Sequence, residues 1–355
     1  MKGRRRIGLL SVAALLLTAL CHNTIPVDQL AQNLSRLSVE ELRDRIELYI
    51  DNRAGTEEIP GAAAAIFKEG TPILWVHKGL AEDQPVSIAS LTKPFTAMVI
   101  IRLARSGKLD LDAPIQEFLP ELKTPAGGSA EEKGNQNSAA EKNAPATLTA
   151  RMLLSHTSGI SYNAGKKEDT FLLEGKRFPL PQAKNRGKFE YSNFNYHILA
   201  ILAHRLSGKP LARLTEDWIL KPAGMRNTKA QGTSGAAGMV STLEDLTRFC
   251  EFLLSENKQE SSPYYRVFQA FQNLEHRKSS NEYGLGWHVY APSNGQALFF
   301  HSGTWYNAAA EIYIMPESSS YFVHIANPPD FRDKATARYR SDVIKMATLA
   351  LTRPD

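Results

Sequence analysis

The sequence predicts an α/β protein of the α+β type, in which helices flank an antiparallel β-sheet and an all-helical domain is inserted. Strand-like apolar stretches occur in residues 39–111 and again in residues 241–355, so these two segments are expected to form one discontinuous α/β sheet domain. Residues 112–240 show helical periodicity and few strand-like stretches, which indicates the inserted domain. With 355 residues, 43% of them hydrophobic, the chain can hold two such domains with a sizeable core.

Residues 1–21 predict an export signal. Four basic side chains precede an apolar run of about 15 residues, which is shorter than a membrane-spanning helix of roughly 18–20. We therefore expect an exported protein of the periplasm or cell envelope. The stretch from Leu17 to Cys21 resembles a bacterial lipoprotein box, so acylation of Cys21, with membrane attachment through the N-terminus, stands beside cleavage near Ala19 to His22 and an uncleaved anchor. Without residues 1–21 the formal charge falls from +5 to +1, which gives no support to a nucleic-acid-binding surface.

The first part of the sheet domain begins with an amphipathic helix from Val39 to Asp51. Two strand-like stretches follow, Gly61 to Phe67 and Ile73 to His77, and the short connection between them predicts a β-hairpin. After a connection through residues 80–86, apolar residues recur at helical spacing from Phe95 to Leu103. This spacing predicts a buried helix just after the first chemical motif.

The second part of the sheet domain contains four strand-like stretches and a final helix. Short connections between consecutive strands predict antiparallel pairing. The strand-like stretches are residues 286–291, 297–301, 308–315 and 321–327, and the helix spans about residues 338–351.

Two features of the inserted domain are not helical. Residues 124–145 contain almost no large apolar side chain, so they are expected to form a flexible surface loop. The tetrapeptide His156-Thr157-Ser158-Gly159 follows a helical Leu-Leu pair and predicts a helix end that is capped by Gly159.

Ser90-Leu91-Thr92-Lys93 is the most informative motif, because it places a hydroxyl and an amine about one turn apart at a helix start. A serine hydroxyl is a weak nucleophile at neutral pH, and a desolvated lysine can take its proton as a neutral amine. The helix start also supplies N–H groups without intrahelical acceptors, which can stabilise the oxyanion of an attacked carbonyl. The motif therefore indicates Ser90 as a nucleophile and Lys93 as its base.

Other patterns in the chain are less informative. A second S-x-x-K, Ser255 to Lys258, lies among polar residues and is interpreted as a solvated helix end. No glycine-rich phosphate loop, H-E-x-x-H or C-x-x-C pattern occurs, so we expect no cofactor and no metal. Cys250 is the only cysteine besides Cys21, so no internal disulfide is expected once the signal is removed.

Two further motifs complete a recognisable set. Tyr191-Ser192-Asn193 precedes a helical run, and His301-Ser302-Gly303-Thr304 follows the apolar stretch 297–300. With Ser90 to Lys93 ahead of them, in this order, they resemble the penicillin-recognising serine hydrolases of the S12 type, most closely the class C β-lactamase-like branch. The resemblance covers nearly the whole chain after residue 21 and implies the β-lactamase/transpeptidase-like fold.

The resemblance also implies roles for these side chains. Ser90 attacks a carbonyl, Lys93 takes its proton, and Tyr191 passes a proton to the leaving group and later activates water. The backbone N–H groups of Ser90 and Thr304 form the oxyanion hole. The substrate-binding residues that the resemblance implies are Asn193, His301, Ser302, Gly303 and Thr304.

His301 stands where β-lactamases usually have lysine. A lysine attracts a substrate carboxylate, whereas an unperturbed histidine is mostly neutral at pH 7. We therefore predict an exported serine hydrolase that acts through a serine acyl-enzyme on an ester, an amide or a D-amino-acid peptide, with a small-molecule or peptidoglycan-like acyl substrate. A true class C-type β-lactamase or D,D-carboxypeptidase is an alternative, and a non-turnover penicillin- or peptidoglycan-binding module is a second one.

Overall fold

The computed structural model describes residues 29–123, 147–163, 170–232, 234–272, 281–290 and 296–353. The export signal predicted at residues 1–21, Cys21 included, and the loop predicted at residues 124–145 lie outside these ranges. None of the helices in the described ranges combines the length and the apolarity that a bilayer crossing requires.

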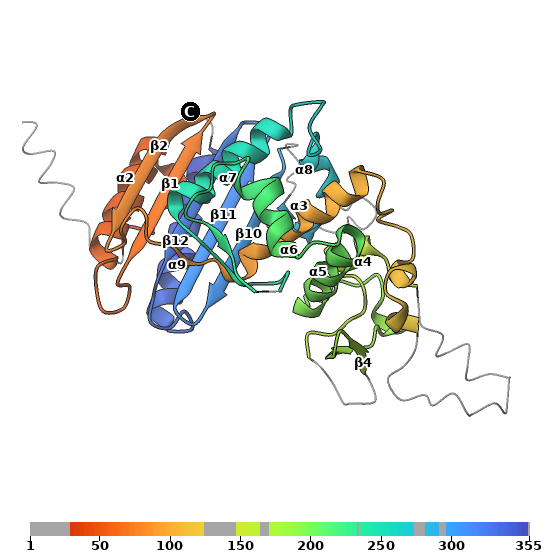
Figure 1. The fold of residues 1–355 in the computed structure, drawn as a ribbon. Coiled ribbons are helices and arrows are strands. Elements are labelled where there is room, and N and C mark those ends of the chain that lie inside the picture. The colour runs from red at the N-terminus through yellow and green to blue at the C-terminus, as the bar shows by residue number, and fades with distance from the viewer. Residues whose placement is uncertain are drawn as a thin grey trace, which may run out of the picture.

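A seven-stranded sheet, antiparallel throughout, forms the centre of the molecule and confirms the predicted fold class (Figure 1). The N-terminal hairpin joins the C-terminal strands where Ala62 pairs with Ala326, so the two ends of the chain build one sheet. In spatial order the strands are β2 (Thr71–Lys78), β1 (Ala62–Lys68), β12 (Ser320–Ala326), β11 (Ala308–Met315), β10 (Leu298–Trp305), β9 (His288–Tyr290) and β8 (Asn281–Tyr283).

Helices cover both faces of the sheet. Alternate side chains of a strand point to opposite faces, and in β1 Ala62 and Ala64 face one helical layer while Ala63 and Ala65 face the other. These small side chains let both layers approach the strand closely. The first layer consists of α2 (Val39–Arg53), which a capping box at Ser38 starts, and α9 (Lys334–Thr352); the second includes α3 (Thr92–Arg105) and α7 (Leu243–Glu256).

The segment between the two sheet-forming parts is mostly helical, but the prediction that it is all-helical was wrong. β4 (Thr170–Leu173) and β5 (Lys176–Pro179) form a hairpin. Glu174 and Gly175 connect them with positive φ angles of 48° and 75°, the geometry of a two-residue hairpin turn. Apart from three short 3-10 turns, the other regular elements described here are α4 (Ala150–Leu154), α5 (Asn193–Ser207), α6 (Leu211–Thr215), the π-helical turn η8 (Glu216–Leu220), β6 (Lys229–Ala230) and β7 (Met239–Ser241).

The end of α4 also differs from the prediction. His156 takes the left-handed conformation, with φ 57°, and the N–H of Thr157 donates to the carbonyl of Met152 at 2.9 Å. These are the features of a Schellman helix end, so His156 and not Gly159 caps the helix. Gly159 is needed for a different reason, since a Cβ there would lie 2.5 Å from the carbonyl oxygen of Gln182.

Candidate active site

Ser90 lies on a short 3-10 turn, η3 (Ala89–Leu91), that leads directly into α3. Ala89 has a φ of 42°, which is unusual for a residue with a Cβ, and such strained backbone is often found at functional sites. The turn places Ser90 on the wall of a cavity of about 500 Å³. Lys93 follows in the first turn of α3, and the spacing of three residues brings its Nζ to 3.0 Å from Ser90 Oγ.

The Lys93 amine is buried, and no carboxylate of the described residues pairs with it. Burial lowers the pKa of Lys93 to about 7, so much of this side chain is the neutral amine at pH 7. Nζ lies 2.8 Å from Asn193 Oδ1 and 2.9 Å from the carbonyl oxygen of Ala236, and both oxygens only accept hydrogen bonds. These acceptors use the two N–H groups of a neutral amine. The nitrogen lone pair is then left for the hydroxyl of Ser90, which can give up its proton there.

Tyr191 and Asn193 reach the same point from the start of α5. The Nζ of Lys93, which contacts Asn193 Oδ1, also lies 4.8 Å from the centre of the Tyr191 ring. Burial raises the pKa of Tyr191 to about 12, and hydrogen bonding with the Ser90 side chain lowers it in part. Tyr191 therefore keeps its proton at neutral pH and can donate it. The structure thus brings Ser90, Lys93, Tyr191 and Asn193 together.

β10 approaches the serine turn so closely that only glycine fits at position 303. A Cβ on Gly303 would lie 1.9 Å from the carbonyl oxygen of Ile88 and 2.8 Å from the amide nitrogen of Leu91. Strand backbone and turn backbone are therefore in direct contact. The His301 to Thr304 motif lies within β10, not after a strand, and this contact sets it beside Ser90.

The backbone of β10 is open on the side of the cavity. β9 pairs with β10 only from Leu298 to Phe300, so among the described residues no strand pairs with His301 to Trp305 on that side. Ser302 and Thr304 line the cavity together with Ser90. An open strand edge can hydrogen-bond an extended chain, and this edge runs directly past the nucleophile position.

His301 is held as a neutral side chain. Its Nδ1 lies 2.8 Å from the carbonyl oxygen of Ser302, and its Nε2 lies 3.1 Å from the hydroxyl of Tyr283. Because a carbonyl only accepts, we assign the proton to Nδ1, and Nε2 then accepts from Tyr283. Burial lowers the pKa of His301 well below its usual value, and the nearby His288 and Lys93 lower it further. His301 therefore supplies no positive charge to the cavity at neutral pH.

His156 supports the Tyr191 segment, a role that the sequence did not reveal. Its Nδ1 accepts hydrogen bonds from the backbone N–H of Ser192 at 3.1 Å and from Asn195 Nδ2 at 3.0 Å. Its carbonyl accepts from the N–H of Glu190 at 2.9 Å, and its ring lies 4.4 Å from that of Tyr191. Burial lowers the pKa of His156 well below its usual value, which keeps it a neutral acceptor. The only sequence signal was the cluster of small polar residues after the Leu-Leu pair.

The second S-x-x-K does not form a pair. The Nζ of Lys258 donates to Ser319 Oγ at 3.0 Å, and Ser255 Oγ accepts from Gln259 Nε2 at 2.9 Å. Ser255 lies in the last turn of α7, as the sequence predicted. The neighbouring groups that could activate a hydroxyl are therefore found at Ser90 and not here.

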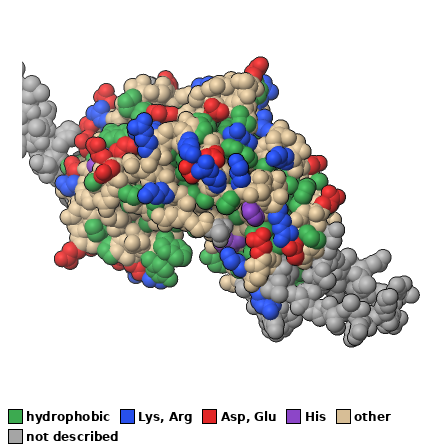
Figure 2. All heavy atoms as spheres, in the orientation of Figure 1, with side chains coloured by type: hydrophobic (Ala, Val, Ile, Leu, Met, Phe, Trp, Pro, Cys, Tyr) green, Lys and Arg blue, Asp and Glu red, His purple; other side chains and the backbone are tan. Residues whose placement is uncertain are grey.

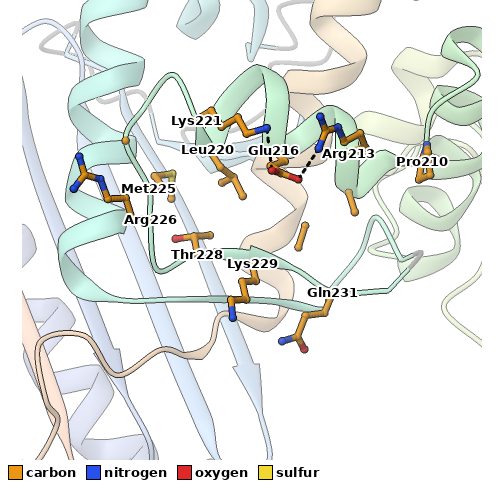
Figure 3. A pocket seen from close by; sticks show the side chains of 13 residues that line it. Pro210, Arg213, Glu216, Leu220, Lys221, Met225, Arg226, Thr228, Lys229 and Gln231 are labelled. Atoms are coloured by element: carbon orange, nitrogen blue, oxygen red, sulfur yellow. Dashed lines mark hydrogen bonds and ion pairs between the residues drawn. The ribbon is translucent and has the colours of Figure 1, made fainter.

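A larger cavity, of about 860 Å³, lies away from these residues, between the η8 region and β6 (Figure 3). On its helical wall Arg213 and Lys221 both turn toward Glu216, at 3.5 and 3.1 Å. None of the predicted site residues lines it. Across the described ranges, no three His, Cys, Asp or Glu side chains are grouped so that they could hold a metal ion. The Ser90 cavity is therefore the candidate active site.

Comparison with known proteins agrees with this geometry. A family model described as Beta-lactamase matches residues 46–344. The chain belongs to the β-lactamase family. The protein is therefore a β-lactamase-like serine hydrolase, and its fold is that of the β-lactamases and transpeptidases.

Proteins that are similar to this chain carry different names. Protein flp of Staphylococcus aureus (strain MW2) is 24% identical over 331 residues, which are 80% of this chain and 63% of that protein, so the chain spans under two thirds of its length. Esterase EstB of Burkholderia gladioli is 28% identical over 220 residues, 54% of this chain and 52% of EstB. A class C β-lactamase structure matches with a TM-score of 0.66 at 17% identity, over 90% of this chain and 99% of that chain. The last match concerns the fold alone.

Proposed function

We propose that this β-lactamase-family hydrolase forms an acyl-enzyme at Ser90, with Lys93 as the base. The observation that carries the proposal is the 3.0 Å contact between Lys93 Nζ and Ser90 Oγ, made by an amine whose two other partners are both acceptors. A pKa near 7 makes this amine a base that is available at neutral pH. A structural lysine would instead be expected to pair with a carboxylate.

The reaction runs in two half-reactions with balanced proton transfers. Ser90 Oγ bonds to the substrate carbonyl carbon while its proton passes to Lys93 Nζ. The leaving group departs with a proton from Tyr191, whose phenol regains one from Lys93, and the acyl group stays on Ser90. In the second half-reaction a water gives a proton to Tyr191 and Lys93 and attacks the carbonyl carbon of the acyl-enzyme. The bond to Ser90 Oγ then breaks, and Ser90 Oγ takes the proton back from the same two side chains.

The rest of the cavity binds and polarises the substrate. The backbone N–H groups of Ser90 and Thr304 stabilise the oxyanion. Asn193 orients Lys93, and its side-chain amide forms a hydrogen bond with a substrate amide. The open edge of β10, including Ser302 and Gly303, binds an extended acyl group. The direct contact of β10 with the serine turn supports these binding roles, because it sets the strand edge beside Ser90.

We further propose that the substrates are esters, amides or D-amino-acid peptides and not carboxylate-bearing antibiotics. The neutral, buried His301 gives a carboxylate no Coulomb attraction at the position where the family usually has lysine. The name of the relative EstB adds support for ester hydrolysis. Penicillins and cephalosporins are then poor substrates.

Covalent labelling tests the proposal. A fluorophosphonate should add one adduct to the wild-type protein and to Ser255→Ala, and none to Ser90→Ala, as measured by intact mass. A p-nitrophenyl ester should then be hydrolysed with a kcat/KM that exceeds that for a chromogenic cephalosporin. An adduct on Ser90→Ala as large as that on the wild type refutes the nucleophile, efficient cephalosporin turnover restores the β-lactamase alternative, and a stable penicillin adduct without turnover indicates a binding module.

We also propose that the protein acts outside the cytoplasm, because four basic side chains and a short apolar run begin the sequence. Mass analysis of the N-terminus of protein isolated from its source should show that the run is removed, or that Cys21 carries a lipid. A soluble cytoplasmic product that retains Met1 contradicts export.

A further inference from the structure

Large exposed aromatic side chains gather around the candidate active site. In the described ranges, six large hydrophobic side chains are exposed, and three of them, Tyr162, Trp305 and Tyr306, line the Ser90 cavity. Each is more than half exposed, at 55%, 56% and 54%. Exposed apolar groups that cluster at one place usually mark a binding surface. Figure 2 agrees, since hydrophobic side chains gather at the lower edge of the sheet, where β10 ends in Figure 1, while charges of both signs are spread over the rest of this face.

Trp305 and Tyr306 form a right-angled corner at the end of β10. Their ring centres are 5.3 Å apart, and the planes meet at 81°. The guanidinium of Arg332 lies over the Tyr306 ring at 4.9 Å, and the N–H of Phe331 donates to the carbonyl of Tyr306 at 2.9 Å. The β12–α9 connection therefore contacts Tyr306, and the Tyr306 ring contacts Trp305, so each of the two aromatic rings has a partner within the protein although each is more than half exposed.

Charge at the cavity is largely satisfied within the protein. Arg332, the one cation among the described residues that line the cavity, donates from Nε and Nη2 to both carboxylate oxygens of Asp330 at 2.9 and 2.8 Å. His301 and His288 have pKa values that burial lowers, to about 4 for His288, so both are neutral. The cavity thus combines aromatic walls with little uncompensated positive charge.

We propose that Trp305, Tyr306 and Phe331 form an aromatic subsite that holds an uncharged aryl group of the substrate, next to the bond that Ser90 attacks. Phe331 and both other residues line the same cavity as Ser90, so a ring on either side of the scissile carbonyl can reach them. Aromatic rings pack on one another in offset or edge-to-face contacts, and the right-angled corner offers both a face and an edge. The preferred substrates are then aryl-bearing esters or amides. This inference rests on the proposed function, because it names the substrate class for that site.

Matched substrates test the subsite. We would measure kcat/KM for four esters that combine an acetyl or phenylacetyl group with a methyl or 2-phenylethyl alcohol. In the wild type, at least one aryl group should raise kcat/KM by about 10-fold or more over its small counterpart. Trp305→Ala should reduce this ratio to near one, and Trp305→Phe should keep most of it.

Trp75→Ala is the matched control, because Trp75 is a tryptophan with similar exposure, 44%, on β2 and does not line the cavity. It should leave the ratio unchanged. A ratio near one in the wild type, or an equal ratio in Trp305→Ala and wild type, overturns the proposal.

A binding measurement separates this inference from the proposed chemistry. The Ser90→Ala protein cannot form an acyl-enzyme, yet its aromatic corner is intact. Phenylacetamide, with its ring on the acyl side, or N-(2-phenylethyl)acetamide, with its ring on the leaving-group side, should bind to it at least about 10-fold more tightly than acetamide, as measured by NMR titration, and adding Trp305→Ala should remove the difference. Equal binding of all three amides refutes the subsite whatever the esters do, while selective binding of one aryl amide without any ester turnover supports the subsite and refutes the hydrolase mechanism.

Discussion

Placing a carboxylate beside Lys93 provides a strict test of the base. In Asn193→Asp, a carboxylate oxygen would lie near the present 2.8 Å from Nζ. At an effective dielectric constant of about 20, Coulomb's law gives roughly 6 kcal/mol of attraction between the carboxylate and the protonated amine at this distance. Even if only about half of this attraction is realised, it raises the pKa of Lys93 by about two units. The pKa should therefore rise from about 7 to about 9 or more. At pH 7 the neutral fraction falls from about one half to about one in a hundred, so Ser90 should react about 50-fold more slowly.

The assay is the second-order rate of labelling by a small neutral fluorophosphonate between pH 5.5 and 10.5, which needs no amide contact with residue 193. In the wild type the rate should rise with pH, with a midpoint near 7, because only the unprotonated amine acts as a base. The Asn193→Asp midpoint should move up by about two units or more, and its rate should recover above it. Asn193→Ala is the control, since it removes the acceptor without adding charge and should not raise the midpoint. An unchanged midpoint in Asn193→Asp would falsify the assignment of Lys93 as the base.

Three further substitutions, one of them with a matched control, test other parts of the site. Tyr191→Phe should lower kcat/KM for an amide by about 10²–10⁴-fold with little change in melting temperature, and undiminished amide turnover would show that the phenol is only structural. Gly303→Ala should destabilise the fold by about 1–3 kcal/mol in urea unfolding and slow labelling, because the new Cβ meets the Ile88 carbonyl at 1.9 Å. In Gly107→Ala the new Cβ would meet no atom within 4 Å, although the φ of 73° strains an alanine, so this control should lose some stability and leave labelling unchanged; equal labelling of both variants would contradict the close contact. His156→Phe should lower kcat through a misplaced Tyr191 while the midpoint near pH 7 stays, and unchanged ester kinetics would refute its positioning role.

The parts of this site that follow from local spacing could be predicted from the sequence. Ser90 and Lys93 are three residues apart at a helix start, so their contact follows from helix geometry alone. The contact of Lys93 with the Ala236 carbonyl spans 143 residues, and no periodicity encodes it. The antiparallel sheet was predictable from short connections, whereas its joining of Ala62 to Ala326 depends on packing of the whole chain.

The errors have equally specific causes. Glycine is the usual residue in the left-handed position of a helix end, yet His156 takes it here, where its ring and carbonyl also hold the Tyr191 segment. The hairpin around Glu174 was missed because its two strands are only four residues long and too short to show a clear alternation. In the first case tertiary contacts decide the conformation, and in the second the strands are too short for single-sequence propensity to detect.

The lowered pKa of Lys93 also means that burying this side chain beside Ser90 reduces the stability of the folded state. An unfolded chain holds the proton on lysine up to about pH 10.5, whereas the folded protein releases it near 7, so the unfolded state binds more protons between these values. Folding stability should therefore rise with pH across this window, and below pH 7 the full penalty, on the order of 5 kcal/mol, weighs against folding. That is comparable with the whole net stability of many domains. A methionine at position 93 would remove this stability penalty. Selection for stability alone would therefore replace the lysine, so the presence of Lys93 favours a catalytic role for its amine.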